Sequence, residues 1–260
     1  MIGVAAFLAQ LIGYMMTTLL IIYGFRLFWN KGLSQYKIQQ RTASRADIGR
    51  EIMSSLRTLL IFSLVYAGLH LGTRAHVFTV YLGVGPLGFA YMLASAVAMI
   101  VAHDAYFYWT HRLMHQPRLY RWFHRTHHKS VTPTVFACYA FDVPEAIVHG
   151  LFVPIWLLVF PMQLAAIWFA LSFMFTINAL GHSGVELFAG AGRSRWFGWW
   201  GTCTGHDLHH STFHYNYALY FTWWDRWMGT DHPLSRHQAR EIPASGAVEV
   251  PGIPMAETAR

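Results

Sequence analysis

The chain alternates between long apolar segments and shorter polar ones. Five segments approach the roughly 20 mostly apolar residues that a membrane-spanning helix needs: about 2–25, 57–72, 87–109, 146–160 and 162–181. Pro161 interrupts the last apolar stretch, and because proline removes a helix donor and clashes with the preceding turn, it predicts a helical hairpin over 146–181. The pattern therefore predicts an all-α, multi-pass transmembrane bundle of about four or five spans.

Polar segments divide this bundle into regions. We expect an N-terminal transmembrane region at 1–101 that contains a basic loop at 26–57. A second region at 102–240 contains the hairpin and most of the histidines, and the stretch 241–260, rich in Pro, Ala and Gly, is expected to be a flexible tail. The first apolar segment lacks a basic leader and a small-residue cleavage site, so it is expected to be a span and not a removable signal peptide.

Composition and charge support a membrane protein and give it an orientation. Of 260 residues, 55% are hydrophobic and only 12% are charged, whereas a soluble domain carries about 25% charged residues. All of the Lys and Arg except Arg74 lie in segments predicted on one side of the membrane, which should therefore be cytoplasmic. These basic residues are scattered among the spans and form no stripe, so anionic lipid headgroups are expected partners and nucleic acid is not. The membrane is the inner membrane in a bacterium or the endoplasmic reticulum in a eukaryote.

Nine of the 16 histidines, with one asparagine, fall into four short motifs near the predicted cytoplasmic ends of the spans. The motifs are His111-x3-His115, His124-x2-His127-His128, Asn178-x3-His182 and His206-x2-His209-His210. Since residues three or four apart share one face of a helix, each motif directs its imidazoles to a common point, as metal ligation requires. One ion takes about four such ligands, so two ions are predicted, and imidazole suits zinc, copper, iron and nickel alike.

The other histidines and the nearby acids are weaker candidates. His70, His76, His149, His232 and His237 are expected to be ordinary surface or core residues, while His103 and His214 lie near the motifs. Ligating imidazoles usually donate their second N–H to a carboxylate or carbonyl. The nearby acids are Asp104, Asp142, Glu145, Glu186, Asp207 and Asp225, among which proximity favours Asp104 and Asp207.

The histidine motifs, interleaved with spans, resemble those of the integral-membrane diiron hydroxylases and desaturases of the fatty acid hydroxylase and sterol desaturase superfamily. The resemblance runs from about 102 to 231, so 102–240 is interpreted as the catalytic domain. The stretch from His127 to Ala137 and the motif His206-Asp207-Leu208-His209-His210 look most like the sterol C-5 desaturase branch. The sequence departs from that branch near Asp142, where a His-Pro pair is usual.

This resemblance implies a histidine-held diiron centre that uses O2 to hydroxylate or desaturate an unactivated C–H bond of a lipid. The lipid is a sterol or other triterpenoid, a fatty acyl chain or a sphingoid base. Asn178 resembles a residue that acts on the metal through a water. The chain has no nucleotide-binding fingerprint or haem-binding module, so electrons are expected from cytochrome b5 or a ferredoxin with its reductase. The candidate docking residues on the basic face are Arg112, Arg121, Arg125 and Lys129.

Two other classes of protein cluster histidines in a membrane. A metal transporter or metal-binding protein should carry ionisable residues along the middle of several spans, but here the ligands gather at one side, which favours the enzyme. A zinc hydrolase is disfavoured by the excess of ligands and the lack of a His-Glu-x-x-His motif.

Overall fold

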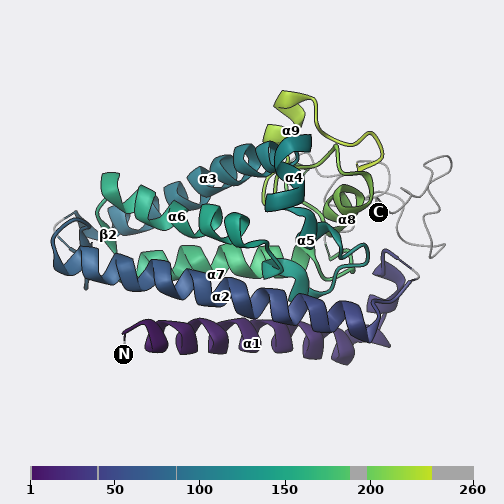
Figure 1. The fold of residues 1–260 in the computed structure, drawn as a ribbon, viewed down its shortest axis with the longest axis horizontal. Helices are drawn as coiled ribbons and strands as arrows, with labels where there is room; N and C mark the ends of the chain where they lie inside the picture. Colours follow the sequence, from purple (N-terminus) through teal and green to yellow (C-terminus); the bar gives the residue numbers. More distant parts are fainter. Residues whose placement is uncertain (1, 40, 86, 188–197, 236–260) are drawn as a thin grey trace.

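The computed structural model describes residues 2–39, 41–85, 87–187 and 198–235, and this part of the chain is mostly helical. The predicted tail at 241–260 lies outside the described residues. Long helices run back and forth along the long axis of the molecule (Figure 1). They are α1 (Ile2–Trp29), α2 (Arg45–Arg74), α3 (Gly88–Met114), α6 (Val143–Val159) and α7 (Leu164–Gly181).

Four of these helices, α1, α2, α3 and α7, are long and apolar enough to cross a membrane. Helix α6 coincides with the span predicted at 146–160 but has only 17 residues. Its length is therefore about 25 Å, less than the roughly 30 Å of the hydrocarbon core. The prediction of an all-α, multi-pass bundle is confirmed.

Helix α2 begins directly after Ser44 and so includes residues 45–57, the last part of the segment 26–57 for which the sequence predicted a loop. Its first turn is fixed by a capping box, in which the Ser44 hydroxyl accepts from the Asp47 N–H at 3.1 Å and the Asp47 carboxylate accepts from the Ser44 N–H at 3.3 Å. The next turns bury polar groups that find partners, such as Glu51, which accepts from the Thr134 hydroxyl at 2.5 Å. Hydropathy missed this part of the helix because its buried face is polar.

Short elements connect the long helices at both ends of the bundle. They are the 3-10 helices η1 (Leu33–Tyr36) and η2 (Val135–Tyr139), the helices α4 (Pro117–Phe123), α5 (Arg125–His128), α8 (Cys203–Thr212) and α9 (Trp223–Met228), and the strands β1 (Val80–Tyr81) and β2 (Met162–Gln163). The chain turns at Pro161 as predicted, and β2 directly after it pairs in parallel with β1, with Val80 opposite Met162. This two-stranded pair joins two loops at one end of the bundle.

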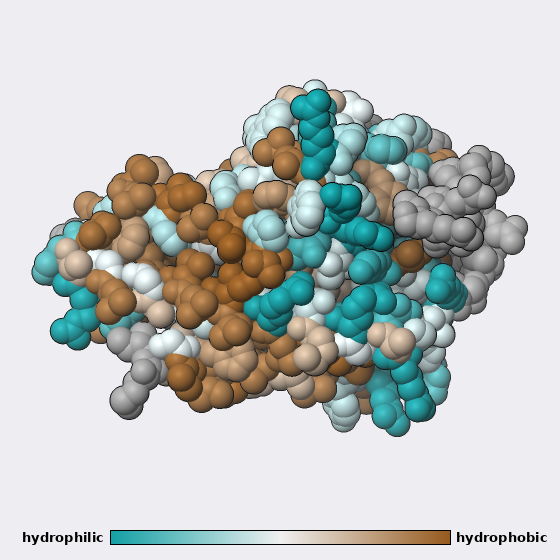
Figure 2. Space-filling model, viewed as in Figure 1, coloured by the Kyte–Doolittle hydropathy of each residue, from teal (hydrophilic) through white to brown (hydrophobic). Residues whose placement is uncertain are grey.

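The core lies between α3, α6 and α7. Its buried residues include Met99, Phe107, Phe152, Leu157, Ala170 and Met174. Outside this core, α1 exposes the apolar side chains of Val4, Ile12, Met16 and Leu20. Apolar residues cover much of one half of the visible face, and hydrophilic residues gather at the other end (Figure 2).

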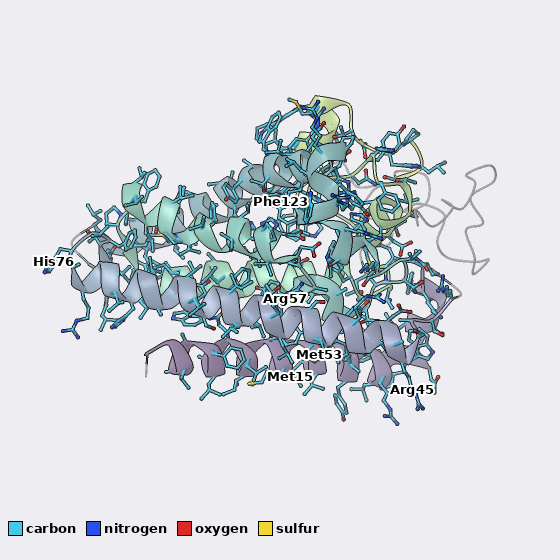
Figure 3. All side chains as sticks on the ribbon, viewed as in Figure 1. Met15, Arg45, Met53, Arg57, His76 and Phe123 are labelled. Carbon is cyan, nitrogen blue, oxygen red and sulfur yellow. The ribbon has the colours of Figure 1, made fainter. Side chains whose placement is uncertain are left out.

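The alternating direction of the long helices brings the histidine motifs to one end of the bundle. The last residues of α1, α3 and α7 and the first residues of α2 and α6 all reach the same end of the bundle, where α4, α5, α8 and α9 form a cap (Figure 1). Arg45, the first residue of α2, marks the cap end, and His76, two residues after α2, marks the opposite end (Figure 3). Every histidine motif of the sequence therefore lies in or beside the cap.

Candidate metal centre

The nine histidines predicted as ligands come together in two groups under the cap. The first imidazole group consists of His111, His115, His124, His128 and His209, and the second imidazole group consists of His127, His182, His206 and His210. Within each group the candidate ligand atoms lie within 4.8 Å of one another, and eight of the nine side chains are buried. Burial of so many polar rings is costly unless a partner such as a metal satisfies them.

Helix geometry explains how neighbouring histidines serve different groups. His124 and His128 are four residues apart and belong to the first group, whereas His127 belongs to the second. In α8, His206 and His210 belong to the second group and His209 to the first. Since adjacent helical residues point about 100° apart, a His-His pair can face two sites at once. Each His-x2-His-His motif therefore contributes to both groups.

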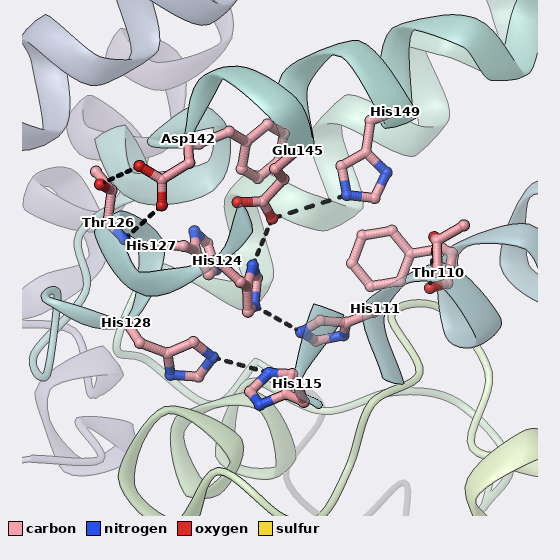
Figure 4. Close-up of polar contacts among 12 residues, drawn as sticks. Thr110, His111, His115, His124, Thr126, His127, His128, Asp142, Glu145 and His149 are labelled. Carbon is pink, nitrogen blue, oxygen red and sulfur yellow. Dashed lines mark hydrogen bonds and ion pairs between the residues drawn. The ribbon is translucent and has the colours of Figure 1, made fainter. Parts of the chain in front are cut away.

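The distances between ring nitrogens fit shared ions. In the first group, the Nε2 atoms of His111 and His124 are 2.9 Å apart, and those of His128 and His115 are 3.2 Å apart (Figure 4). His128 Nε2 also lies 3.1 Å from His209 Nε2. Two imidazole nitrogens bound about 2.1 Å from one ion are about 3.0–3.4 Å apart at right to tetrahedral angles. The spacing is thus that of ligands converging on one point.

The second imidazole group has the same spacing. His182 Nε2 lies 2.9 Å from His206 Nε2 and 3.2 Å from His127 Nε2, and His206 Nε2 lies 3.1 Å from His210 Nε2. The residues present therefore fit two metal ions, with five imidazoles around the first site and four around the second. This agrees with the two ions predicted from ligand number.

Outer hydrogen bonds fix the orientation of several rings. The Nδ1 atoms of His111, His182 and His209 lie 2.7, 2.8 and 2.7 Å from the backbone oxygens of Tyr217, Asn178 and Tyr215. An Nδ1–H donated to a carbonyl leaves the Nε2 lone pair free for a metal.

The environment also keeps the imidazoles neutral. Burial lowers the pKa of His209 to about 4, and a hydrogen bond to the Tyr215 carbonyl only partly opposes this. Burial likewise lowers the pKa of His182 to about 4. Neutral imidazole is the form that binds metals, so at neutral pH the rings need not lose a proton before ligation.

The Glu145 carboxylate contacts a ligand ring. Its Oε1 lies 2.6 Å from His124 Nδ1, and both side chains are almost fully buried (Figure 4). Glu145 stands in the first turn of α6, far in sequence from His124. The sequence named it only among the nearby acids, and no local spacing signals the contact, because it depends on how α6 packs against the cap.

The two acids that the sequence favoured make other contacts among the described residues. The Asp104 carboxylate accepts from the backbone N–H groups of Tyr220 and Phe221 at 3.1 and 3.2 Å and from Trp223 Nε1 at 2.8 Å. Asp207 accepts from Gln39 Nε2 at 2.6 Å, and burial raises its pKa to about 7. Both carboxylates therefore join segments around the site, Asp104 joining α3 to the start of α9 and Asp207 joining α8 to the α1–α2 connection.

Replacing Asp104 by alanine is expected to lower stability more than it affects metal binding. Two backbone N–H groups and one indole N–H would lose their acceptor, and each buried unsatisfied donor costs about 1–3 kcal/mol. We expect the melting temperature in detergent to fall by about 5 °C or more. The melting temperature of Asp104→Asn, which keeps one acceptor oxygen, should fall less. An unchanged melting temperature of Asp104→Ala would contradict the structural role of Asp104.

The remaining candidates lie next to the two groups. The side-chain amide of Asn178 donates to the Cys138 carbonyl at 2.8 Å, so its contact with a metal through water stays a prediction. His103 lies outside both groups with its Nδ1 3.0 Å from the Tyr220 hydroxyl, and His214 is exposed.

Comparison with known proteins agrees with this arrangement. A family model described as fatty acid hydroxylase matches residues 96–230, which include all nine ligand candidates. The chain belongs to the fatty acid hydroxylase family. The matched region contains both imidazole groups. No solved structure matches the chain significantly.

Curated relatives of this fatty acid hydroxylase family member are sterol-modifying enzymes. It is 30% identical over 185 residues to Delta(7)-sterol 5(6)-desaturase of Gibberella zeae, a match that covers 71% of this chain and 56% of that protein. It is 30% identical over 241 residues to methylsterol monooxygenase 1 of Gallus gallus, covering 86% of this chain and 75% of that protein. Lathosterol oxidase of Rattus norvegicus is 30% identical over 193 residues, 73% of this chain and 63% of that protein.

These matches confirm the resemblance to the sterol desaturase branch. Because the relatives are named as a desaturase, a monooxygenase and an oxidase, they give no support to the metal-transporter alternative. The match spans little more than half of the fungal desaturase, so activity and substrate are treated below as proposals.

Proposed function

We propose that this chain is an O2-dependent oxidoreductase that hydroxylates or desaturates an unactivated C–H bond of a membrane lipid. The observation that carries the proposal is the pair of interlocking imidazole groups at one end of an apolar helix bundle. The names of the relatives favour a sterol or another triterpenoid-like lipid over a fatty acyl or sphingoid chain.

The two imidazole groups would each hold one iron ion. Bound iron would supply the activation of O2 and the oxidation of the C–H bond. The chain's own residues direct the Nε2 lone pairs inward, through the Nδ1 contacts of His111, His124, His182 and His209. They also exclude water, since eight of the nine ligand side chains are buried, and water exclusion strengthens the interactions inside such a site.

The basic residues support an orientation with the metal centre on the cytoplasmic side. The sequence placed all of the Lys and Arg except Arg74 on one side, and the helix ends that flank those segments lie at the cap. Arg74 is the last residue of α2, at the opposite end. Because Lys and Arg are enriched in the cytoplasmic segments of membrane proteins, the cap would lie in the cytoplasm. The chain would then lie in a bacterial inner membrane or in the endoplasmic reticulum.

An external protein would deliver the electrons to the basic surface of the cap. Arg121, Arg125 and Lys129 are exposed on α4, on α5 and directly after α5, beside the buried ligands of the same segment. We expect the donor, a cytochrome b5 or a ferredoxin with its reductase, to present an acidic surface to this patch.

Reversing this charge should slow electron delivery and spare the metal centre. We expect the double variant Arg121→Glu, Arg125→Glu to raise the KM for the donor protein about tenfold at low salt, with the difference shrinking as salt is added. Turnover with a small chemical reductant should stay close to wild type. An unchanged KM for the donor at low salt would place docking elsewhere.

Lipid analysis tests the proposed reaction directly. Membranes that contain the chain, supplied with O2 and an electron donor, should convert an endogenous lipid to a product that has gained one oxygen atom or lost two hydrogen atoms. Mass spectrometry of lipids from cells with and without the gene would identify that product. Identical lipid profiles, together with no O2 consumption by the iron-loaded chain, would contradict the proposal.

A further inference from the structure

A cavity lies between the metal centre and the apolar middle of the bundle. It is lined from α2, α3, η2, α6 and α7, and its aromatic walls include Phe62, Tyr66, Phe107, Tyr139, Phe152 and Phe175. Phe107 precedes the ligand His111 by one helical turn, and Asn178, another lining residue, precedes the ligand His182 by one turn. The cavity therefore adjoins both imidazole groups.

His149 is a polar side chain in the wall of this cavity whose hydrogen-bonding capacity is unused. It is buried in α6, and neither Nδ1 nor Nε2 has a hydrogen-bond partner among the described residues. Its Nε2 lies 3.8 Å from Glu145 Oε1, a distance that makes an ion pair with a protonated imidazole, drawn as a dashed line in Figure 4, but is too long for a hydrogen bond. A buried polar group without a partner is unfavourable, so such a group beside a cavity indicates a missing ligand.

The position of His149 is fixed and close to the metal ligands. Its ring stacks on Phe107 with centroids 5.1 Å apart and packs against Phe141 at 5.1 Å. Phe107 in turn lies 5.0 Å from the ring of His111, and Phe141 lies 5.6 Å from the ring of His127. Two successive ring contacts of 5.0–5.6 Å therefore separate His149 from each imidazole group.

The walls of the cavity suit a rigid molecule with flat faces. Aromatic side chains present large, stiff surfaces, and fused rings lose less conformational entropy against them than a flexible acyl chain does. The open space is about 70 Å³, smaller than the roughly 150 Å³ apolar cavity that holds benzene. Only one end of a large lipid can enter, and side chains must move to admit it.

We propose that His149 is a substrate-positioning residue that hydrogen-bonds to a hydroxyl oxygen on the terminal ring of a polycyclic lipid. The inference rests on the proposed function and names the substrate class for it. A neutral imidazole has one donor and one acceptor nitrogen, and a hydroxyl group can satisfy either. The hydroxyl-bearing end then enters the cavity first, and oxidation falls on the ring system that carries this hydroxyl.

A binding experiment tests this role without turnover. The iron-loaded full chain in detergent, without an electron donor, is titrated with tritiated cholestanol, with cholestane, which lacks its hydroxyl group, and with the chain alcohol hexadecanol. We expect cholestanol to bind about tenfold more tightly than cholestane, as one net hydrogen bond allows. His149→Phe, which keeps an aromatic ring in the stack, should reduce this ratio to about one, and His149→Gln should retain part of it. The matched control is His70→Phe, because His70 is exposed on α2.

Several outcomes would overturn the inference. They are an equal affinity of the wild type for cholestanol and cholestane, an unchanged ratio in His149→Phe, hexadecanol binding as tight as that of cholestanol, or no binding of cholestanol. Iron content is measured on the same samples. A wild type that holds two iron ions but binds cholestanol and cholestane equally would contradict this inference alone. A wild type that holds no iron would contradict the proposed function.

Discussion

Replacing His209 by alanine is expected to abolish activity and to remove one metal ion per chain. His209 Nε2 lies 3.1 Å from His128 Nε2, and its ring lies 4.5 Å from the ring of His111 and 4.8 Å from that of His115. Changes to residues that merely support a metal ligand typically cost 10–100-fold in metal affinity or activity, so loss of a ligand should cost at least about 100-fold. The measurements are metal content and lipid oxidation by the purified variant.

His127→Ala is the complementary test, because His127 belongs to the second imidazole group. It should also abolish activity, but the ion that remains should be the one held by the first group. His214→Ala is the matched control, since His214 is exposed and lies just after α8. It should keep both ions and normal turnover. Activity that survives both ligand substitutions would show that the ligand assignment is wrong.

Replacing Glu145 by alanine is expected to weaken metal binding about 10–100-fold. The Glu145 carboxylate is the acceptor for His124 Nδ1 at 2.6 Å, and without it the ring can rotate or change tautomer. A titration of the metal-free chain with ferrous iron, monitored by retained activity and by bound iron, measures the loss.

Glu145→Gln separates hydrogen bonding from charge. Its amide oxygen can still accept from His124, so this variant should bind iron more tightly than Glu145→Ala and less tightly than wild type. Wild-type iron affinity in Glu145→Ala would show that the contact does not support the ligand.

The spacing of the histidines predicted which residues four apart share a group, because ligation depends on local helix geometry, but the expectation that each whole motif serves one point is wrong for both His-x2-His-His motifs. His111 and His115, four residues apart at the end of α3, fall in one group as the helical repeat requires. The spacing alone did not predict that His127 and His128 would serve different groups. That division depends on where α5 begins and how it meets α8, and α5 is only four residues long.

The supporting contacts could not be read from the sequence, because they join distant segments. Asp104 lies two turns before His111 in α3, yet its carboxylate binds the Tyr220 backbone instead of an imidazole. Glu145 reaches His124 only through the packing of α6 against the cap. Backbone carbonyls such as that of Tyr217 are acceptors in every sequence, so no residue pattern marks the ones that orient ligands.

Hydropathy predicted the spans better than their ends. The apolar stretch before Pro161 forms α6, but at 17 residues this helix is shorter than a spanning helix. The start of α2 was missed because its polar side chains are buried against partners such as Thr134, and hydropathy cannot distinguish buried polar residues from solvated ones.

The metal content of the full chain, purified without oxygen and analysed by elemental analysis and Mössbauer spectroscopy, tests the central claim most directly. The two imidazole groups predict two iron ions per chain with nitrogen-rich ligation, and one ion lost in each of His209→Ala and His127→Ala. A single tightly held zinc ion per chain, unaffected by one of these substitutions, would contradict the claim of a dimetal oxidation centre.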